Sequence, residues 1–217
     1  MKERPILFSG AMVRALLAGT KTQTRRIVKP QPQMVTNNRT LPWEGDPAAL
    51  MRLMEIQGKH CPYGQPGDRL WVRETCRADE LPDGLDGVRY LADRDWRAIE
   101  NTRQAADDWV KLNHYCGKRG ATVPAIHMPR WASRITLEIT GVRVQRLTDI
   151  SEGDARAEGA RECDPVSGRE VLLAGQSQRG SFVLHYRDIW EQINGPGSWD
   201  ANPWVWAVDF KRLEAAA

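Results

Sequence analysis

The chain has 217 residues, of which 41% are hydrophobic and 27% are charged, and its formal net charge is +3. This composition fits one globular domain with an insertion, or two very small domains, and it argues against disordered and collagen-like chains. No stretch approaches the roughly 18 to 20 consecutive apolar residues of a membrane span, and no secretory apolar segment follows residues 1–5, so we expect a cytoplasmic protein without membrane contact.

The positive charge is concentrated at the N-terminal end. Residues 1–30 contain seven basic side chains against Glu3, so they carry a net charge of +6 and the rest of the chain carries −3. The basic residues are Lys2, Arg4, Arg14, Lys21, Arg25, Arg26 and Lys29. Such a segment is a candidate anion-binding site, and the alternative is a solvated basic face that serves only solubility.

Residues 5–28 predict a strand, a short helix and an extended segment. Pro5–Phe8 is apolar enough for a strand, and Ser9 can cap a helix that ends at Gly19. The β-branched residues of 21–28 favour an extended conformation. Residues 30–65 are rich in proline, glycine and asparagine, which predicts a long loop with a helix around 48–56.

The middle of the chain predicts one more strand and an insertion. A turn at 66–68 leads into a strand over 69–74, whose side chains alternate in polarity. Residues 77–128 are expected to be the insertion, with a strand near 88–91 and a helix over 101–112. The sequence assigns this insertion no role.

The C-terminal part predicts two strands with helices between them. In the strand over 133–146, the apolar side chains change from one face of the strand to the other at Gly141, which predicts a bulge there. Ser151 caps a short helix that ends at Gly159. A longer helix has Phe182, Tyr186, Ile189 and Ile193 on one face, and the last strand has Trp204, Trp206, Val208 and Phe210 on one face.

These elements do not alternate regularly, so a doubly wound parallel sheet does not fit. We expect an α+β protein, mainly β, in which helices surround a small curved β-barrel. Residues 1–217 are expected to form a single domain that carries the insertion at 77–128.

Chemistry is most concentrated just after Gly19. An amine in an apolar neighbourhood next to guanidiniums has a lowered pKa, so Lys21 is a candidate base and Thr24 a candidate nucleophile. The alternative is that Lys21, Arg25 and Arg26 bind phosphate oxygens while the threonines only favour the strand. Glu158, in the last turn of its helix, is a candidate acid, and the alternative is an exposed glutamate.

The octapeptide Gly19–Arg26 resembles the G-x-K-x-x-x-x-R motif of the ASCH domains in the PUA-like superfamily. The turn at 66–68, the strand near 135–144 and the closing segment 205–211 are similar to later elements of that family. The chain as a whole is similar to phage or prophage members. This resemblance implies the β-barrel and a partner that is RNA or a modified nucleoside.

Within that family, the resemblance is to small bacterial amidohydrolases that deacetylate N4-acetylcytidine. It implies that Lys21 removes a proton from Thr24, that Thr24 attacks the acetyl carbonyl, and that Glu158 serves the cytosine amine or a water. Other ASCH proteins are RNA-binding modules or ribonucleases. A non-catalytic reader of RNA or modified bases is therefore the alternative, and a ribonuclease is the third hypothesis.

Several other residues are candidates for ligand contact. Thr22, Arg25 and Arg26 adjoin Lys21, and Arg73 ends the strand over 69–74. The chain has 9 tryptophans, and Trp131 lies in a loop-like context where its indole can stack on a base. We expect no bound metal, because the spacing typical of zinc ligands is absent from the candidate residues His60, Cys61, Cys76, His114 and Cys116. We also expect no cofactor, because the sequence contains no P-loop or dinucleotide-binding glycine motif.

Overall fold

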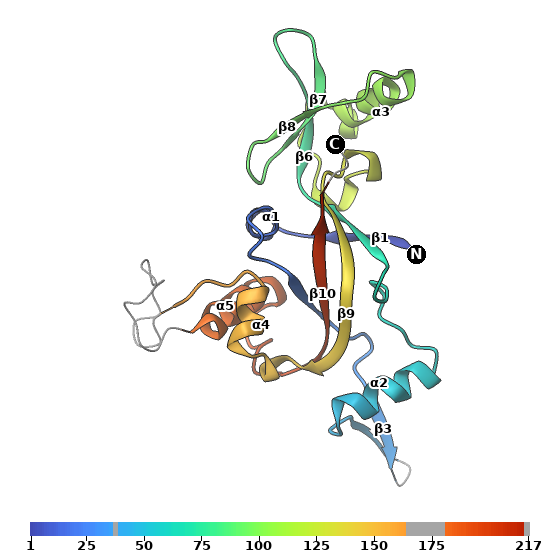
Figure 1. The fold of residues 1–217 in the computed structure, drawn as a ribbon, viewed down its shortest axis with the longest axis vertical. Helices are drawn as coiled ribbons and strands as arrows, with labels where there is room; N and C mark the ends of the chain where they lie inside the picture. Colours follow the sequence, from blue (N-terminus) through green and yellow to red (C-terminus); the bar gives the residue numbers. More distant parts are fainter. Residues whose placement is uncertain (37–38, 164–180, 215–217) are drawn as a thin grey trace. The chain divides into compact units, whose positions relative to one another are not determined.

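The computed structural model describes residues 1–36, 39–163 and 181–214, and it divides into two compact units. Unit 1 comprises residues 1–18, 69–138 and the segment from Arg212 onward, and unit 2 comprises residues 19–68 and 139–211 (Figure 1). The insertion expected at 77–128 therefore lies entirely in unit 1. No helix among the described residues is both long and apolar enough to cross a membrane.

Unit 1 begins with a parallel strand pair. β1 (Glu3–Leu7) lies parallel to β5 (Arg69–Arg73), and β5 pairs antiparallel with the start of β9 (Thr136–Arg146). The predicted helix after Ser9 is confirmed as α1 (Gly10–Leu17), and the Ser9 hydroxyl accepts the Met12 N–H at 3.4 Å.

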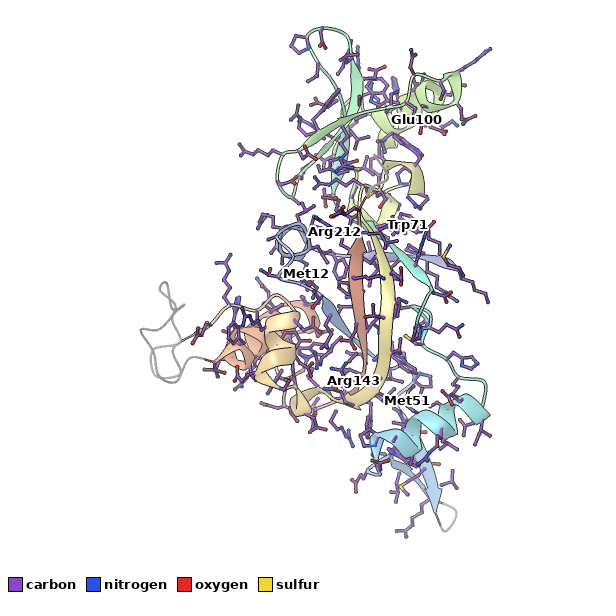
Figure 2. The ribbon with its side chains drawn as sticks, viewed as in Figure 1. Met12, Met51, Trp71, Glu100, Arg143 and Arg212 are labelled. Carbon is purple, nitrogen blue, oxygen red and sulfur yellow. The ribbon has the colours of Figure 1, made fainter. Side chains whose placement is uncertain are left out.

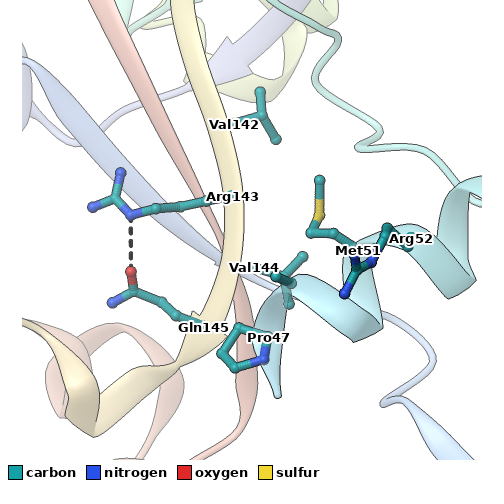
Figure 3. Close-up of a pocket in the computed structure, with 8 residues that line it drawn as sticks. Pro47, Met51, Arg52, Val142, Arg143, Val144 and Gln145 are labelled. Atoms are coloured by element: carbon teal, nitrogen blue, oxygen red, sulfur yellow. Dashed lines mark hydrogen bonds between the residues drawn. The ribbon is translucent and has the colours of Figure 1, made fainter. Parts of the chain in front are cut away.

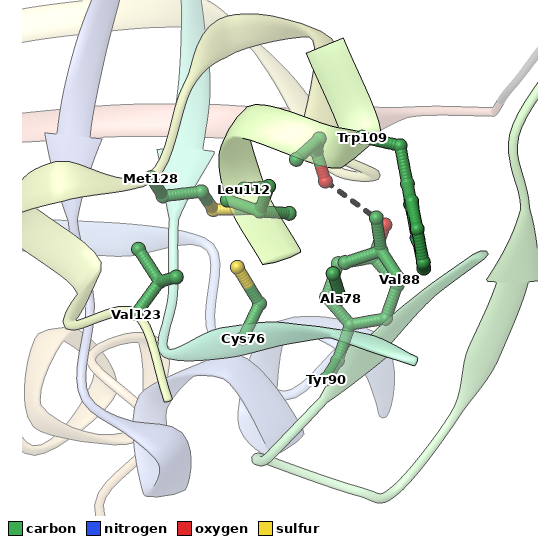
Figure 4. Packing of buried hydrophobic residues seen from close by; sticks show 9 residues of the cluster. Cys76, Ala78, Val88, Tyr90, Trp109, Leu112, Val123 and Met128 are labelled. Atoms are coloured by element: carbon green, nitrogen blue, oxygen red, sulfur yellow. Dashed lines mark hydrogen bonds between the residues drawn. The ribbon is translucent and has the colours of Figure 1, made fainter. Parts of the chain in front are cut away.

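The insertion builds its own small sheet and core. β6 (Cys76–Glu80), β7 (Asp86–Tyr90) and β8 (Trp96–Ala98) form an antiparallel sheet, against which α3 (Arg103–Asn113) packs. Short 3-10 turns follow at Tyr115–Gly117, Ala125–His127 and Arg130–Ala132. The core residues are Cys76, Ala78, Val88, Tyr90, Trp109, Leu112, Val123, Met128 and Ala132 (Figure 4). The sequence predicted the helix and one strand here, but not that the segment has a hydrophobic core.

Unit 2 is built on the body of β9, on β10 (Trp204–Leu213) and on β2 (Gln23–Ile27). β9 and β10 run side by side, and β2 pairs antiparallel with β10 (Figure 1). The helices α4 (Glu152–Ala157) and α5 (Phe182–Asn194) pack on each other. Their shared core contains Leu147, Ile150, Ala155, Ala160, Tyr186, Trp190, Trp199 and Val205.

Residues 30–65 contain more regular structure than a loop. The expected helix is α2 (Pro47–Ile56), whose Asp46 cap accepts the Ala49 N–H at 2.8 Å. Ahead of it, β3 (Gln33–Thr36) and β4 (Arg39–Pro42) form a two-stranded hairpin that the sequence did not predict.

The predicted β-barrel is wrong, although the α+β class holds. Unit 1 has the strand order β1-β5-β9 and unit 2 has the order β9-β10-β2, with β1 and β2 as the outermost strands. Neither unit contains a closed ring of strands within the described parts of the chain. A barrel needs every strand paired on both sides. Hydrophobic alternation identifies strands but does not specify their partners, so the sequence could not exclude open sheets.

The close approach of Trp96 to Gly87 yields a stability prediction. A Cβ at Gly87 would lie 2.4 Å from the Trp96 ring and 2.5 Å from the Arg97 carbonyl oxygen. We expect Gly87→Ala to lower the free energy of unfolding by about 1–3 kcal/mol, because the backbone must shift. Urea denaturation followed by circular dichroism measures this change.

The matched control is Gly153→Ala, where the nearest atom to the added Cβ is the Ser151 hydroxyl at 3.8 Å. Alanine also favours the α4 helix, so this variant should be as stable as wild type or more stable. Equal stability of both variants and wild type would refute the steric argument.

Candidate functional site

The candidate site lies in unit 2, where the chain entering β2 is held against the end of α4. Gly19 has a φ of 73°, a conformation that glycine adopts without steric cost, and it leads the chain out of α1. Lys21 then forms an isolated antiparallel bridge with Glu158. The Thr22 N–H donates to the Ala157 carbonyl at 2.8 Å, and the Phe210 N–H donates to the Thr22 carbonyl at 2.9 Å. These backbone bonds determine where the Lys21 side chain begins.

Lys21 and Glu158 form a buried ion pair. The Lys21 Nζ lies 2.8 Å from the Glu158 Oε2 and also 2.8 Å from the Glu158 backbone carbonyl oxygen. The exposed fractions of the two side chains are 0% and 2%. Glu158 is the C-cap that directly follows α4, one residue beyond the last turn in which it was predicted, and the alternative of an exposed glutamate is wrong. Two charges buried this deeply depend on each other for compensation.

The surroundings shift the pKa of Lys21 in the direction that the sequence predicted. Burial lowers the pKa, the contact with Glu158 raises it, and the positive charges of Arg26 and Arg25 lower it further. The net effect is a pKa below the ordinary value of 10.5. The Lys21 amine is therefore closer to its neutral, basic form than a solvated lysine is.

Arg25 connects this pair to a second carboxylate. Its Nη1 donates to the Glu158 Oε1 at 3.2 Å and to the Gln23 Oε1, and its Nη2 donates to the Asp154 Oδ2 at 2.9 Å. Burial alone would raise the pKa of Asp154, but hydrogen bonding from Gln23 and the charges of Arg25 and Arg143 lower it. Asp154 therefore stays ionised within the cluster.

The cluster extends to β9 and β10. The Arg143 guanidinium donates to the Asp209 Oδ2 at 2.7 Å and to the Asp154 Oδ1 at 2.9 Å. Gly141 leaves room for Asp209, since a Cβ there would lie 3.0 Å from the Asp209 Oδ2. The cationic residues are Lys21, Arg25 and Arg143, and the carboxylates are Asp154, Glu158 and Asp209. The formal charges of these six residues cancel.

Tyr186 of α5 packs against the Arg25 side chain of this cluster. It is buried, and its ring centroid lies 5.9 Å from the Arg25 guanidinium carbon. Burial and the negative charge of Glu158 raise its pKa, so the phenol stays protonated. The sequence placed Tyr186 only on the apolar face of a helix, and this second role was missed.

Thr24 does not join the pair. It lies opposite Val208 in the β2–β10 register, and it is buried. Successive strand side chains point to opposite faces, so Thr24 faces away from the side on which Gln23 and Arg25 meet Asp154. Within the described residues, no hydrogen bond connects its hydroxyl to the Lys21 amine or the Glu158 carboxylate. Its role as a nucleophile stays a prediction without supporting geometry.

The other predicted ligand residues are divided between the two units. Thr22 is exposed and Arg26 is half-buried, and both lie in unit 2 near Lys21. Arg73 and Trp131 lie in unit 1. The Arg73 guanidinium carbon lies 4.8 Å from the Trp71 ring centroid, and Trp131 is half-exposed.

A separate cavity of about 490 Å³ in unit 2 is mostly apolar and lies between α2 and β9 (Figure 3). Figure 3 shows Val142 and Val144 directed toward α2, whereas Arg143 and Gln145 point to the other side of the strand. Its lining includes Arg143 of the charged cluster, whereas neither Lys21 nor Glu158 lines it.

Comparisons with protein-family models, curated proteins and solved structures find no match to this chain. The metal-ligating residue types also form no group of three or more among the described residues.

The Lys21–Glu158 contact predicts an asymmetric response to substitution. Glu158→Gln removes the carboxylate charge that compensates the buried Lys21 amine, and we expect a loss of about 3–5 kcal/mol in the free energy of unfolding. Lys21→Met should cost less, because Arg25 still compensates Glu158. The double variant should lose less than the two single losses combined, with a coupling energy of about 0.5–3 kcal/mol.

Urea denaturation of the four proteins measures these energies, and Lys59→Met, at an exposed position, is the matched control. Strict additivity of the two single losses would show that the pair contributes no interaction energy.

The lowered pKa of Lys21 predicts how stability depends on pH. Between that lowered pKa and 10.5, the unfolded chain holds the Lys21 proton more often than the folded protein does. Stability therefore rises with pH across this window. We expect the stability difference between wild type and Lys21→Met to increase on the alkaline side, measured by urea denaturation at several pH values. A difference that falls with pH would mean that the folded pKa is raised instead.

Proposed function

We propose that unit 2 binds an acylated nucleobase, of the N4-acetylcytidine type, at the Lys21–Glu158 pair. The observation that carries this proposal is the buried contact of 2.8 Å between an amine donor and a carboxylate acceptor. An N-acylated exocyclic amine presents an N–H donor beside a carbonyl acceptor. The Glu158 carboxylate can accept a hydrogen bond from this N–H, and the Lys21 amine can donate one to this carbonyl oxygen. The ion pair is therefore complementary to the acylated amine.

The charge balance of the cluster favours an uncharged ligand group over a phosphate. Because the three cations and three carboxylates compensate one another, no cationic excess in these six residues is available for an anion. A buried ion pair usually costs stability relative to apolar side chains, so its presence is more readily explained by chemistry than by folding. The resemblance of Gly19–Arg26 to the ASCH motif points to the same residues.

Binding requires side chains to move. Both members of the pair are almost completely buried, so a ligand has to displace part of their cover and replace one of their hydrogen bonds. Rotamer changes of this kind are common in binding sites.

A second candidate function is hydrolysis of the acyl group, and the lowered pKa of Lys21 favours it. Lys21 would remove a proton from a water, and the water oxygen would bond to the acetyl carbon. The C–N bond then breaks, and the cytosine amine takes up the proton that Lys21 removed, which yields cytidine and acetic acid. Water is the nucleophile in this scheme because Thr24 faces the other side of β2.

The proposal predicts selective, salt-insensitive binding. We expect calorimetry to show that N4-acetylcytidine binds more tightly than cytidine, with little change between about 50 and 200 mM salt. Lys21→Met and Glu158→Gln should each weaken binding roughly tenfold or more, because a buried ligand group loses a charged hydrogen-bond partner. Lys59→Met should bind like wild type, and circular dichroism checks that each variant is folded.

Chromatography of the same mixtures separates the reader from the hydrolase. Cytidine formed by wild type and not by Lys21→Met or Glu158→Gln supports hydrolysis, and retained turnover in Thr24→Val supports water as the nucleophile. Binding without product supports the reader. Equal affinity for the acetylated and unmodified nucleosides, or unchanged binding in both variants, would disprove the proposal.

A further inference from the structure

We infer that unit 1 carries a separate pocket for an uncharged, unpaired nucleobase, which stacks on Trp131 and offers its amino group to Glu100. This inference does not depend on the function proposed for unit 2. It assigns a role to the insertion at 77–128, because most of the pocket is built from that segment.

The pocket is a cavity of about 480 Å³, and all of its lining residues lie in unit 1. It is bounded by β7, by the segment from β8 to the first turns of α3, and by residues 131–134. This volume falls within the roughly 300–1,000 Å³ of known small-molecule sites. The cavity is therefore large enough for a nucleobase with part of its sugar.

The floor of the pocket consists of core residues. Val88, Tyr90 and Ala132 line it, and all three belong to the core of the insertion (Figure 4). The Tyr90 hydroxyl donates to the Ala132 carbonyl at 2.9 Å, which ties β7 to the turn that carries Trp131. A floor made of core residues needs little rearrangement on binding, so little affinity is lost to ordering.

Arg134 strengthens one wall but is not available to a ligand anion. Its side chain is 1% exposed, and it forms ion pairs with Glu74 at 2.8 Å, Asp93 at 2.9 Å and Asp95 at 3.0 Å. Its guanidinium carbon also lies 4.0 Å from the Tyr90 ring centroid. Three carboxylates thus compensate this cation, and it acts as a structural support.

Trp131 provides the stacking surface. Its exposed fraction is 38%, whereas Trp71 and Trp109 of the same unit are 8% and 6% exposed. An indole that stays exposed at the edge of a cavity offers a planar apolar face, and every nucleobase can stack on such a face.

The polar groups at the rim select the ligand. Glu100 is exposed next to α3 (Figure 2). Its carboxylate has no side-chain partner among the described residues. Asp108 is occupied by Gln104 and Lys111, each at 2.9 Å. The cations of the lining are already paired, Arg97 with Asp95 at 3.5 Å and Arg134 with Glu74, Asp93 and Asp95. An uncharged ligand with an amino group therefore fits better than a phosphate, and cytosine fits better than uracil.

The same chemistry occurs in a free nucleoside and in an unpaired base of single-stranded RNA. NMR titrations of the full chain with cytidine, uridine, cytidine 5′-monophosphate and a short oligocytidylate distinguish these sources. The pocket predicts tighter binding of cytidine than of uridine, and no gain from the phosphate. Tighter binding of the oligocytidylate identifies RNA as the source, and equal binding identifies the nucleoside.

Substitutions of Trp131 and of Glu100 test the stacking contact and the amino-group contact separately. Trp131→Ala should weaken cytidine binding about 5- to 140-fold, as expected when a stacking ring is removed, and Trp131→Phe should weaken it less. Glu100→Gln should reduce the preference for cytidine over uridine. Ile126→Ala is the matched control, because Ile126 is an exposed apolar residue of unit 1 outside the pocket.

Repeating the titrations in Glu158→Gln separates this inference from the function proposed for unit 2. Cytidine binding that persists there and is lost in Trp131→Ala supports the pocket in unit 1. No binding of cytidine or oligocytidylate, or equal affinities of Trp131→Ala, Ile126→Ala and wild type, would overturn it. Loss of all binding in Glu158→Gln with retention in Trp131→Ala would overturn it and leave the proposal for unit 2 intact.

Discussion

Burial of the Lys21 amine is the constraint on which the arrangement of unit 2 depends. An ammonium without solvent needs a nearby carboxylate, and the bridge between Lys21 and Glu158 brings the two side chains to 2.8 Å. Glu158 in turn is shared with Arg25, and Arg25 is shared with Asp154. Each buried charge is thus compensated by the next, which ties α4, β2 and, through Arg143, β9 to one another.

The two units present different chemistry. In unit 2, ionised groups are buried against Tyr186 and the pKa of Lys21 is lowered, which suits recognition or proton transfer at a polar group of a ligand. In unit 1, Arg134 is fully compensated, and the cavity beside it presents the half-exposed Trp131 over an apolar floor. The cluster in unit 2 is suited to one functional group of a ligand, and the cavity in unit 1 is suited to a planar ligand surface.

The sequence and the structure agree on single elements and disagree on how the elements combine. Ser9 and Ser151 cap helices where predicted, because capping depends on a hydroxyl and an N–H three residues away. The prediction of a β-barrel was wrong because contacts between residues far apart in the chain determine which strands pair. The structure likewise separates Thr24 from Lys21, since alternation along β2 turns its side chain toward the other face.

The amino-acid sequence alone identified Lys21 and Glu158 as candidate site residues. Lys21 follows a helix that ends at a glycine and Glu158 lies at the end of another helix, and both patterns are local. Only the tertiary structure decided that Asp154, Arg143 and Asp209 complete the cluster and that Tyr186 covers it. Asp209 and its partner Gln23 are 186 residues apart, and they meet because backbone hydrogen bonds pair β10 with β2. Local sequence specifies how each segment folds, whereas contacts between distant segments exist only once backbone pairing and burial have brought those segments together.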